Sequence, residues 1–217
     1  MKRLLSLGKS SIYFIFVIIG GLFLLIELMT ALVMLIIKPD STFLVAPLIL
    51  PAAAGLTTVM VSTKQAYSLF QLAIKMGATR KSTLSGLLLL IFGESFAAIL
   101  TAWLLAHLDM AITYRVWGTY IPGLHISGTS LIIPFWGMAA IAVGVPMLGM
   151  ILTAALHKFG AKALWIVWAL YMVLCLAPGA VGGALVKIPR DVLYLLPFVV
   201  LGIFLWAISY LRKASIK

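Results

Sequence analysis

The sequence predicts an all-α polytopic membrane protein with six transmembrane helices, and three observations support this fold class. Hydrophobic residues make up 64% of the 217 residues and charged residues only 10%, whereas a soluble domain has about 45–50% and about 25%. Six apolar stretches are long enough to cross a hydrocarbon core of roughly 30 Å. The basic residues gather in alternate connections between these stretches. Together these features leave no room for a soluble domain.

The six spans are expected to form a single transmembrane domain covering residues 1–217. Their expected limits are about Ile12–Ile37, Phe43–Thr63, Thr83–His107, Thr129–Leu156, Ala163–Val186 and Val192–Leu211. The basic segment Met1–Ser11 resembles the start of a signal peptide, but the apolar run after it continues to Ile37 without a small-residue cleavage site. The first stretch is therefore interpreted as an uncleaved span.

Several spans contain residues that interrupt or tighten helices. Pro47 and Pro51 lie in the second span and Pro134 and Pro146 in the fourth, where neighbouring helices or a cavity can satisfy the freed carbonyls. The stretch Pro178–Gly183 ends the fifth span, either as a re-entrant turn or as a helix end followed by a loop. Small residues in the fourth span predict a face for close helix contact: Gly137, Ala140 and Gly144.

The distribution of basic residues predicts the orientation. With the N-terminus in the cytoplasm, twelve of the sixteen Lys and Arg residues lie on the inner side, and the outer loops hold four: Lys38, Arg115, Lys187 and Arg190. Basic residues near span ends stay in the cytoplasm, so both termini are expected on the cytoplasmic side of a bacterial-type inner membrane. The net charge of +11 is then explained by anchoring to anionic lipid, and no nucleic-acid partner is expected.

Motifs for enzymatic chemistry were not found. Gly8-Lys9-Ser10 resembles the end of a phosphate-binding loop, but Arg3 occupies the position of the first glycine. None of the three histidines has a second ligand at i+3 or i+4, so no metal site is expected; they are His107, His125 and His157. The single cysteine, Cys175, is interpreted as a packed thiol. The chain is not expected to be an enzyme.

Two acidic residues lie deep in the expected bilayer, Glu27 in the first span and Glu94 in the third. Such residues usually face the bundle interior or water. Counted from the cytoplasmic ends, their depths differ by roughly 6 Å, so they could share a polar cavity that lines a translocation pathway. The alternative is that each is protonated and hydrogen-bonded to a neighbouring helix.

The inner loop Lys64–Lys81 predicts a short amphipathic helix. Its polar stripe, at i, i+4, i+7 and i+11, consists of Lys64, Ser68, Gln71 and Lys75. The opposite apolar stripe consists of Ala66, Leu69, Phe70, Ala73 and Met76. Gly77 is suited to end this helix, and Thr79 or Ser82 can cap the third span. Such a helix either lies on the inner leaflet or docks a cytoplasmic partner.

The segment Leu69–Lys81 resembles permease subunits of the ABC-2 type, many of which carry F-x-x-A-x-x-x-G-x-[ST]-R-[KR] between spans two and three. The matching residues are Phe70, Ala73, Gly77, Thr79, Arg80 and Lys81. Six spans, both ends inside and a length near 220 extend the resemblance loosely to the whole chain. The chain differs from larger members in its short N-terminal segment and in lacking a large extracellular domain.

The resemblance implies a membrane subunit of an ATP-binding cassette exporter, forming the translocation pathway with a second permease, identical or different. Two copies of a separate ATP-binding subunit would hold ATP and Mg, with no cofactor in this chain. The implied coupling residues are Lys64, Ser68, Phe70, Gln71, Lys75, Gly77, Thr79, Arg80 and Lys81, and the implied pathway residues are Glu27 and Glu94. The alternative function is a substrate-capture subunit of a vitamin-uptake transporter, against which the matched segment counts.

Overall fold

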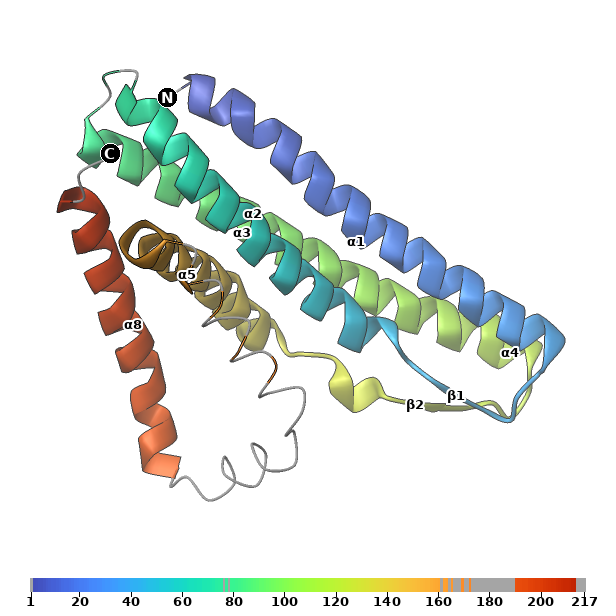
Figure 1. The fold of residues 1–217 in the computed structure, drawn as a ribbon. Helices are drawn as coiled ribbons and strands as arrows, with labels where there is room; N and C mark the ends of the chain where they lie inside the picture. The colour runs from blue at the N-terminus through green and yellow to red at the C-terminus, as the bar shows by residue number, and fades with distance from the viewer. Residues whose placement is uncertain are drawn as a thin grey trace.

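The computed structural model describes residues 2–75, 77, 79–160, 162, 163, 165, 169, 172 and 190–213. Within these residues the chain is built of long α-helices joined by short irregular segments and one pair of short strands (Figure 1). In chain order the elements are α1 (Lys2–Ile36), β1 (Ser41–Phe43), α2 (Ala46–Lys75), α3 (Arg80–Ile112), a π-helical turn (Thr113–Trp117), α4 (Gly118–Tyr120), β2 (His125–Ser127), a 3₁₀ turn (Thr129–Leu131), α5 (Phe135–Phe159) and α8 (Arg190–Lys213).

Four of the described helical segments are long and apolar enough to cross a membrane: Ser11–Ile36, Ala46–Leu72, Arg80–Tyr120 and Phe135–Phe159. The prediction of a multi-pass membrane protein is confirmed to this extent. The expected fifth span, Ala163–Val186, falls almost entirely outside the described residues. The expected sixth span is covered by α8. The helices also extend further than the apolar runs predicted, since α1 begins at Lys2 and α3 at Arg80.

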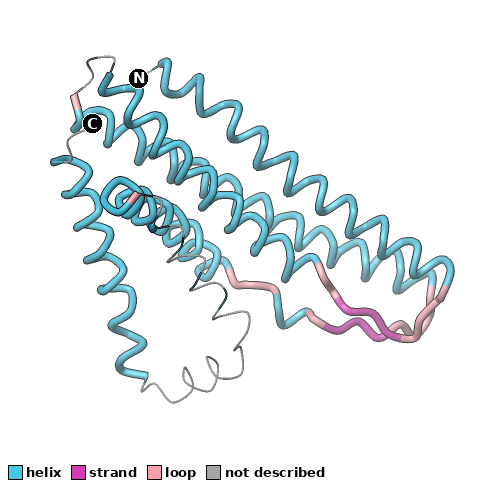
Figure 2. Tube along the Cα trace, viewed as in Figure 1, coloured by secondary structure: helices cyan, strands magenta, loops and turns pink. Residues whose placement is uncertain are grey.

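The three longest helices, α1, α2 and α3, run side by side, and α5 packs on α2 and α3 while α8 packs on α5 (Figures 1 and 2). Both chain termini lie at the same end of the bundle as the α2–α3 connection (Figure 1). We call this the basic end, because its helix termini carry Lys2, Lys75, Arg80, Lys158 and Arg212. The strands β1 and β2 lie at the opposite end.

The α1 helix is held by a single stripe of buried side chains. Ile15, Ile19, Phe23 and Ile26 recur at helical spacing and are at most 8% exposed, in one apolar cluster with residues of α2, α3 and α5. Residues on its other faces, such as Val17 at 71% exposure, are apolar and open to the surroundings. An apolar helix with an uncovered apolar face is the pattern expected for contact with lipid or with another membrane chain.

The two strands join distant parts of the chain at the opposite end. β1 pairs with β2 in parallel, with Ser41 opposite His125 and Phe43 opposite Ser127. Gly128 follows β2 with a φ of +89°, and a Cβ there would lie 3.3 Å from backbone atoms of Leu44. Glycine fits because it adopts this conformation without strain and lets the two segments approach closely. The loop after α1 is thus fastened to the loop before α5.

The segment predicted as a short separate helix is the last part of α2, which runs without a break from Ala46 to Lys75. That prediction of a separate helix was wrong because Ala66, Leu69 and Phe70 are buried in a cluster with α3, α5 and α8. Since their apolar surface is covered by protein, the segment does not need to lie on a membrane surface. The predicted ending is confirmed, because Gly77 has a φ of +82°.

Close packing between α2 and α5 occurs at Gly149. A Cβ at this position would overlap the Ser62 hydroxyl and lie 3.0 Å from Ser62 Cβ. The Thr63 hydroxyl also lies 3.4 Å from the Gly149 carbonyl oxygen, to which it donates. Of the predicted small-residue face, Gly144 makes no such contact, because a Cβ there would meet no neighbouring atom within 4 Å in the described part of the chain.

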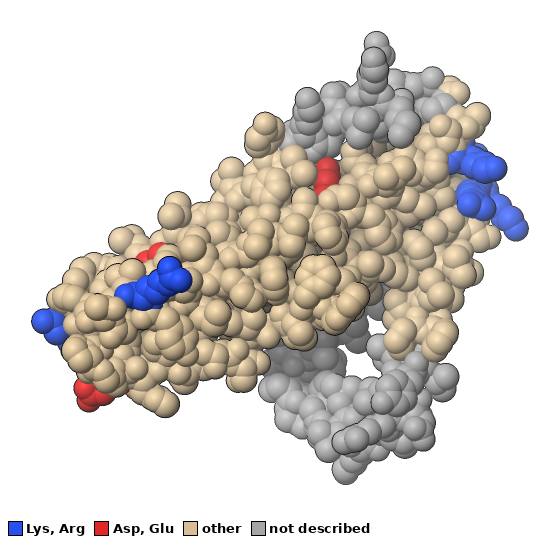
Figure 3. Space-filling view, turned by 180° about the vertical axis from the view of Figure 1, so that it is seen from behind, with Lys and Arg blue, Asp and Glu red and all other residues tan. Residues whose placement is uncertain are grey.

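Basic side chains gather at the two ends of the face shown in Figure 3, and the broad middle shows no basic group. This arrangement predicts labelling from opposite sides of a membrane for cysteines at the exposed residues Ser68, near the basic end, and Thr119, near the opposite end. The measurement is accessibility to a membrane-impermeant maleimide in intact cells and inverted vesicles, with the natural Cys175 replaced by alanine. Labelling of both positions from one side would contradict the orientation.

Candidate functional site

The residues that carry the family resemblance surround the α2–α3 connection at the basic end. Lys75, Gly77, Thr79 and Lys81 are exposed there. Thr79 caps α3, its side-chain oxygen accepting a hydrogen bond of 3.4 Å from the Ser82 backbone N–H. This confirms the predicted cap and fixes the direction in which α3 leaves the turn.

Arg80 ties the start of α3 to the end of α8. Its Nη1 donates to the backbone carbonyl of Arg212 at 3.4 Å. Basic groups near a helix C-terminus interact favourably with its unpaired carbonyls. A force applied at the turn would therefore reach α8 as well as α2 and α3.

The predicted coupling residues divide into exposed and buried groups. Lys64 and Ser68 are exposed, as is Lys75, and Gln71 is half-buried, so the polar stripe is confirmed as the outer face of α2. Phe70 is only 1% exposed and its ring packs edge-on to His157, with centroids 6.3 Å apart. Phe70 therefore belongs to the core and does not offer a contact surface to a partner.

Glu94 is held by a polar partner on α2. Gln65 Nε2 donates to both carboxylate oxygens of Glu94, at 3.1 and 2.9 Å. Glu94 is 6% exposed and Gln65 is 5% exposed, so the pair is buried between α2 and α3. These two hydrogen bonds join α2 to α3 and satisfy the Glu94 carboxyl group where it is buried.

Glu27 meets a different acidic residue. Its carboxyl group lies close to that of Asp109, which is only 2% exposed on α3, and the two acidic groups interact. Among the described residues, Glu27 Oε1 and Asp109 Oδ2 are buried without a partner. The two groups form a polar contact between α1 and α3 near the opposite end.

The structure does not place Glu27 and Glu94 in one cavity, and Glu94 has instead the hydrogen-bonded partner on a neighbouring helix that the alternative interpretation gave it. Glu27 lies beside Asp109, and Asp109 is fifteen residues beyond Glu94 on the same helical run, which is about 22 Å along the axis. The expected depth failed because α1 begins ten residues before the apolar run that was used to count its entry. Two separate polar contacts replace the single predicted one.

Sequence reasoning missed Gln65 and Asp109 as partners. Gln65 carried a usable signal, because it lies one residue before Ala66 and four before Leu69, on the apolar side of the helix. Asp109 was assigned to an outer loop because the apolar run ends near it. The structure extends the helical run to Tyr120 by inserting a π-helical turn.

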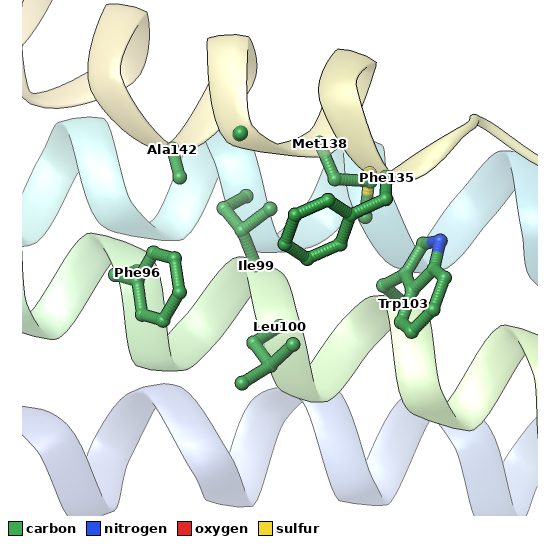
Figure 4. A pocket seen from close by; sticks show the side chains of 8 residues that line it. Phe96, Ile99, Leu100, Trp103, Phe135, Met138 and Ala142 are labelled. Atoms are coloured by element: carbon green, nitrogen blue, oxygen red, sulfur yellow. The ribbon is translucent and has the colours of Figure 1, made fainter.

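The apolar pocket between α3 and α5 is too small for a substrate. Figure 4 shows Trp103 and Phe135 at one end of it and Phe96 at the other. Its volume is about 10 Å³, near that of one water probe. Trp103 Nε1 also donates to the Ile133 carbonyl at 3.0 Å, so the site is a packed helix contact.

The described residues contain no group of three or more His, Cys, Asp and Glu side chains that could hold a metal ion. His107 instead places Nδ1 2.9 Å from the Trp103 carbonyl, and His157 stacks on Tyr67 with ring centroids 4.7 Å apart. These two histidines therefore contribute to packing near opposite ends of the bundle.

Comparison of the chain with protein-family models, curated proteins and solved structures gives no match. The function is therefore argued from the geometry of the chain and from the resemblance of its α2–α3 segment.

Proposed function

We propose that this chain is the membrane-spanning permease subunit of an ATP-binding cassette exporter, resembling the ABC-2 type. The observation that carries the proposal is the α2–α3 connection, where the matched residues Gly77, Thr79, Arg80 and Lys81 end one long helix and begin the next. Both termini lie at this end. In the proposed orientation the basic end faces the cytoplasm of a bacterial-type cell, where a soluble ATPase can reach it.

The length of α2 supports a coupling role. It is one helix of 30 residues, or about 45 Å, so displacement at Lys75 would move its whole length. A partner can drive such a motion only by binding two arrangements of the helix with different affinity. The separate coupling helix first expected is replaced in this proposal by the end of α2, with its exposed side chains.

The proposed docking surface consists of the exposed and half-buried polar residues around the turn: Ser68, Gln71, Lys75, Gly77, Thr79, Arg80 and Lys81. It carries three basic groups, so we propose an acidic groove on each of two ATP-binding subunits, which bind ATP and Mg. A second permease, identical or different, would complete the pathway. The uncovered apolar face of α1 and the half-buried Glu27 make α1 the proposed border of that pathway.

Reversing the charge at Lys75 and Arg80 (Lys75→Glu with Arg80→Glu) is expected to weaken association with the ATPase by about tenfold or more, because like charges across an interface cost several kcal/mol. Loss of the Arg80 contact with the Arg212 carbonyl should also loosen α8 from α3. The measurement is co-purification with a candidate ATP-binding subunit, together with ATP-driven transport in vesicles.

The matched control is Lys38→Glu with Arg115→Glu, which makes the same change in net charge at the opposite end and should leave association unchanged. Normal association and transport in the Lys75 and Arg80 variant would contradict the docking role. A chain that instead binds one small vitamin tightly as a monomer would support the substrate-capture alternative.

A further inference from the structure

A cleft of about 540 Å³ lies between α1 and α2, in the half of the bundle nearer the basic end. Its lining residues are Ser11, Phe14 and Ile18 of α1 and Thr57, Met60, Val61 and Lys64 of α2. The volume is within the range of about 300–1,000 Å³ typical of small-molecule sites, and it is far larger than the pocket between α3 and α5. Nothing in the proposed function uses it.

The lining changes from a charged and polar mouth to a largely apolar interior along the helix axes, where the Thr57 hydroxyl bonds to the Ala53 and Ala54 carbonyls of its own helix. Ser11 and Lys64 lie toward the basic end, and Ile18 and Thr57 lie seven residues further into the bundle, which is about 10 Å on each helix. The two helices run in opposite directions, so these pairs match in depth. Between them, Phe14, Met60 and Val61 supply an apolar floor. The cleft therefore has the polarity of a lipid, with a charged mouth and a hydrocarbon interior.

Lys64 has no acidic partner among the side chains that the structure describes. Glu94 is bonded to Gln65, and Glu27 and Asp109 contact each other about 20 Å nearer the opposite end. Asp40 lies beyond the end of α1, also at the opposite end. An exposed ammonium group at the edge of an apolar cleft is therefore available to an anion from outside the chain.

Lys64 lies one turn of α2 before Ser68, so it is further from the α2–α3 turn than any residue of the proposed docking surface. It precedes Lys75 by eleven residues on α2, or about 16 Å. When the turn projects toward the cytoplasm, Lys64 lies at the level where lipid headgroups meet the protein. Anionic headgroups attract basic side chains at this depth.

We propose that the cleft binds one anionic phospholipid of the inner leaflet, with its phosphate at Lys64 and Ser11 and one acyl chain along Phe14, Ile18 and Met60. The side-chain hydroxyl of Ser11 supplies a hydrogen bond to a phosphate oxygen, and Lys64 supplies the charge. The other acyl chain remains in the bilayer. This inference does not depend on the proposed export function.

The test uses the purified full-length chain in detergent and native mass spectrometry, with phosphatidylglycerol and phosphatidylcholine of identical acyl chains as probes. We expect one phosphatidylglycerol per chain to be retained more tightly than phosphatidylcholine. Lys64→Gln should weaken phosphatidylglycerol binding by about fivefold, the effect of one basic group at an anionic surface, and leave phosphatidylcholine unchanged. Lys75→Gln, which removes the same charge, should leave the binding of both phospholipids unchanged.

Two further variants test the apolar part of the cleft. Thr57→Trp should fill it and displace the retained lipid, and Thr57 makes hydrogen bonds only within its own helix, to Ala53 and Ala54. Met60→Trp replaces a side chain that is 72% exposed, so it fills the cleft without changing the core. Both variants should keep the thermal unfolding midpoint of the parent chain.

Several results would overturn the proposal. Equal binding of the two phospholipids, or equal losses in the Lys64→Gln and Lys75→Gln variants, would show non-selective contact. Unchanged phosphatidylglycerol binding in both tryptophan variants would exclude the cleft. Palmitate bound as tightly as phosphatidylglycerol would identify a fatty-acid site instead, and a chain that retains no lipid because a second copy covers the cleft would identify a dimer contact.

Discussion

Replacing Gly149 with alanine is expected to destabilise the helix bundle by about 1–3 kcal/mol, the usual cost of forcing an extra methyl group into a packed contact. The new Cβ would overlap the Ser62 hydroxyl and press on Ser62 Cβ at 3.0 Å and on the Thr63 backbone nitrogen at 3.5 Å. The contact lies between α2 and α5, so either the Ser62 side chain must turn away or the two helices must move apart. Thermal unfolding in detergent, followed by circular dichroism, measures the effect.

The chain offers a matched control and a rescue for this prediction. Gly144→Ala makes the same chemical change on the same helix, at a position where a Cβ meets nothing within 4 Å among the described residues, so it should leave stability unchanged or slightly raise it. Ser62→Ala removes the overlapping hydroxyl and should recover part of the loss when combined with Gly149→Ala. Equal effects of alanine at positions 144 and 149 would contradict the packing described for α2 and α5.

Replacing Gln65 with leucine is the second substitution for which we expect a large effect. It removes the amide that donates to both oxygens of Glu94 and leaves a carboxyl group buried at 6% exposure without a donor. An unsatisfied buried polar group costs about 1–3 kcal/mol, and a charged one more. The unfolding midpoint of Gln65→Leu should fall accordingly.

A double-mutant cycle tests whether the hydrogen bonds between Gln65 and Glu94 stabilise the fold. Gln65→Leu combined with Glu94→Leu removes both polar partners and should be more stable than Gln65→Leu alone, because no buried group is left unpaired. Glu94→Gln should keep much of the stability, since it retains the size and part of the hydrogen bonding. A double variant less stable than both single variants would contradict the structural role assigned to the pair.

The fold could be predicted from the sequence where periodicity and length decide it. The apolar runs located α1, α2, α3 and α5, because a membrane requires about 20 apolar residues per helix. The ends of the helices could not be predicted in this way. Polar side chains such as Lys75 and Arg80 continue a helix as readily as they end it, whereas Gly77, with its positive φ, and the capping residue Thr79 marked boundaries correctly.

The candidate site likewise has features that could be predicted from the local sequence and features that could not. The polar stripe on α2 was predicted because amphipathic spacing depends on the local sequence alone. The partners of Glu94 and Glu27 depend on which helices lie side by side and at what depth, and this depends on contacts between distant parts of the sequence, such as those of Phe70 and Gly149. Hydropathy carries no information on depth once helices extend beyond the hydrocarbon core.

The strand pair β1–β2 limits how a chain of this shape can change conformation. Leu44 N–H donates to the Ser127 carbonyl, and His125 N–H donates to the Asp40 carbonyl. The connection between α1 and α2 is therefore hydrogen-bonded to the connection between α3 and α5. These hydrogen bonds restrain the helices from moving apart at this end of the bundle. Relative movement of these helices is therefore expected to be larger at the basic end than at the end that carries the strands.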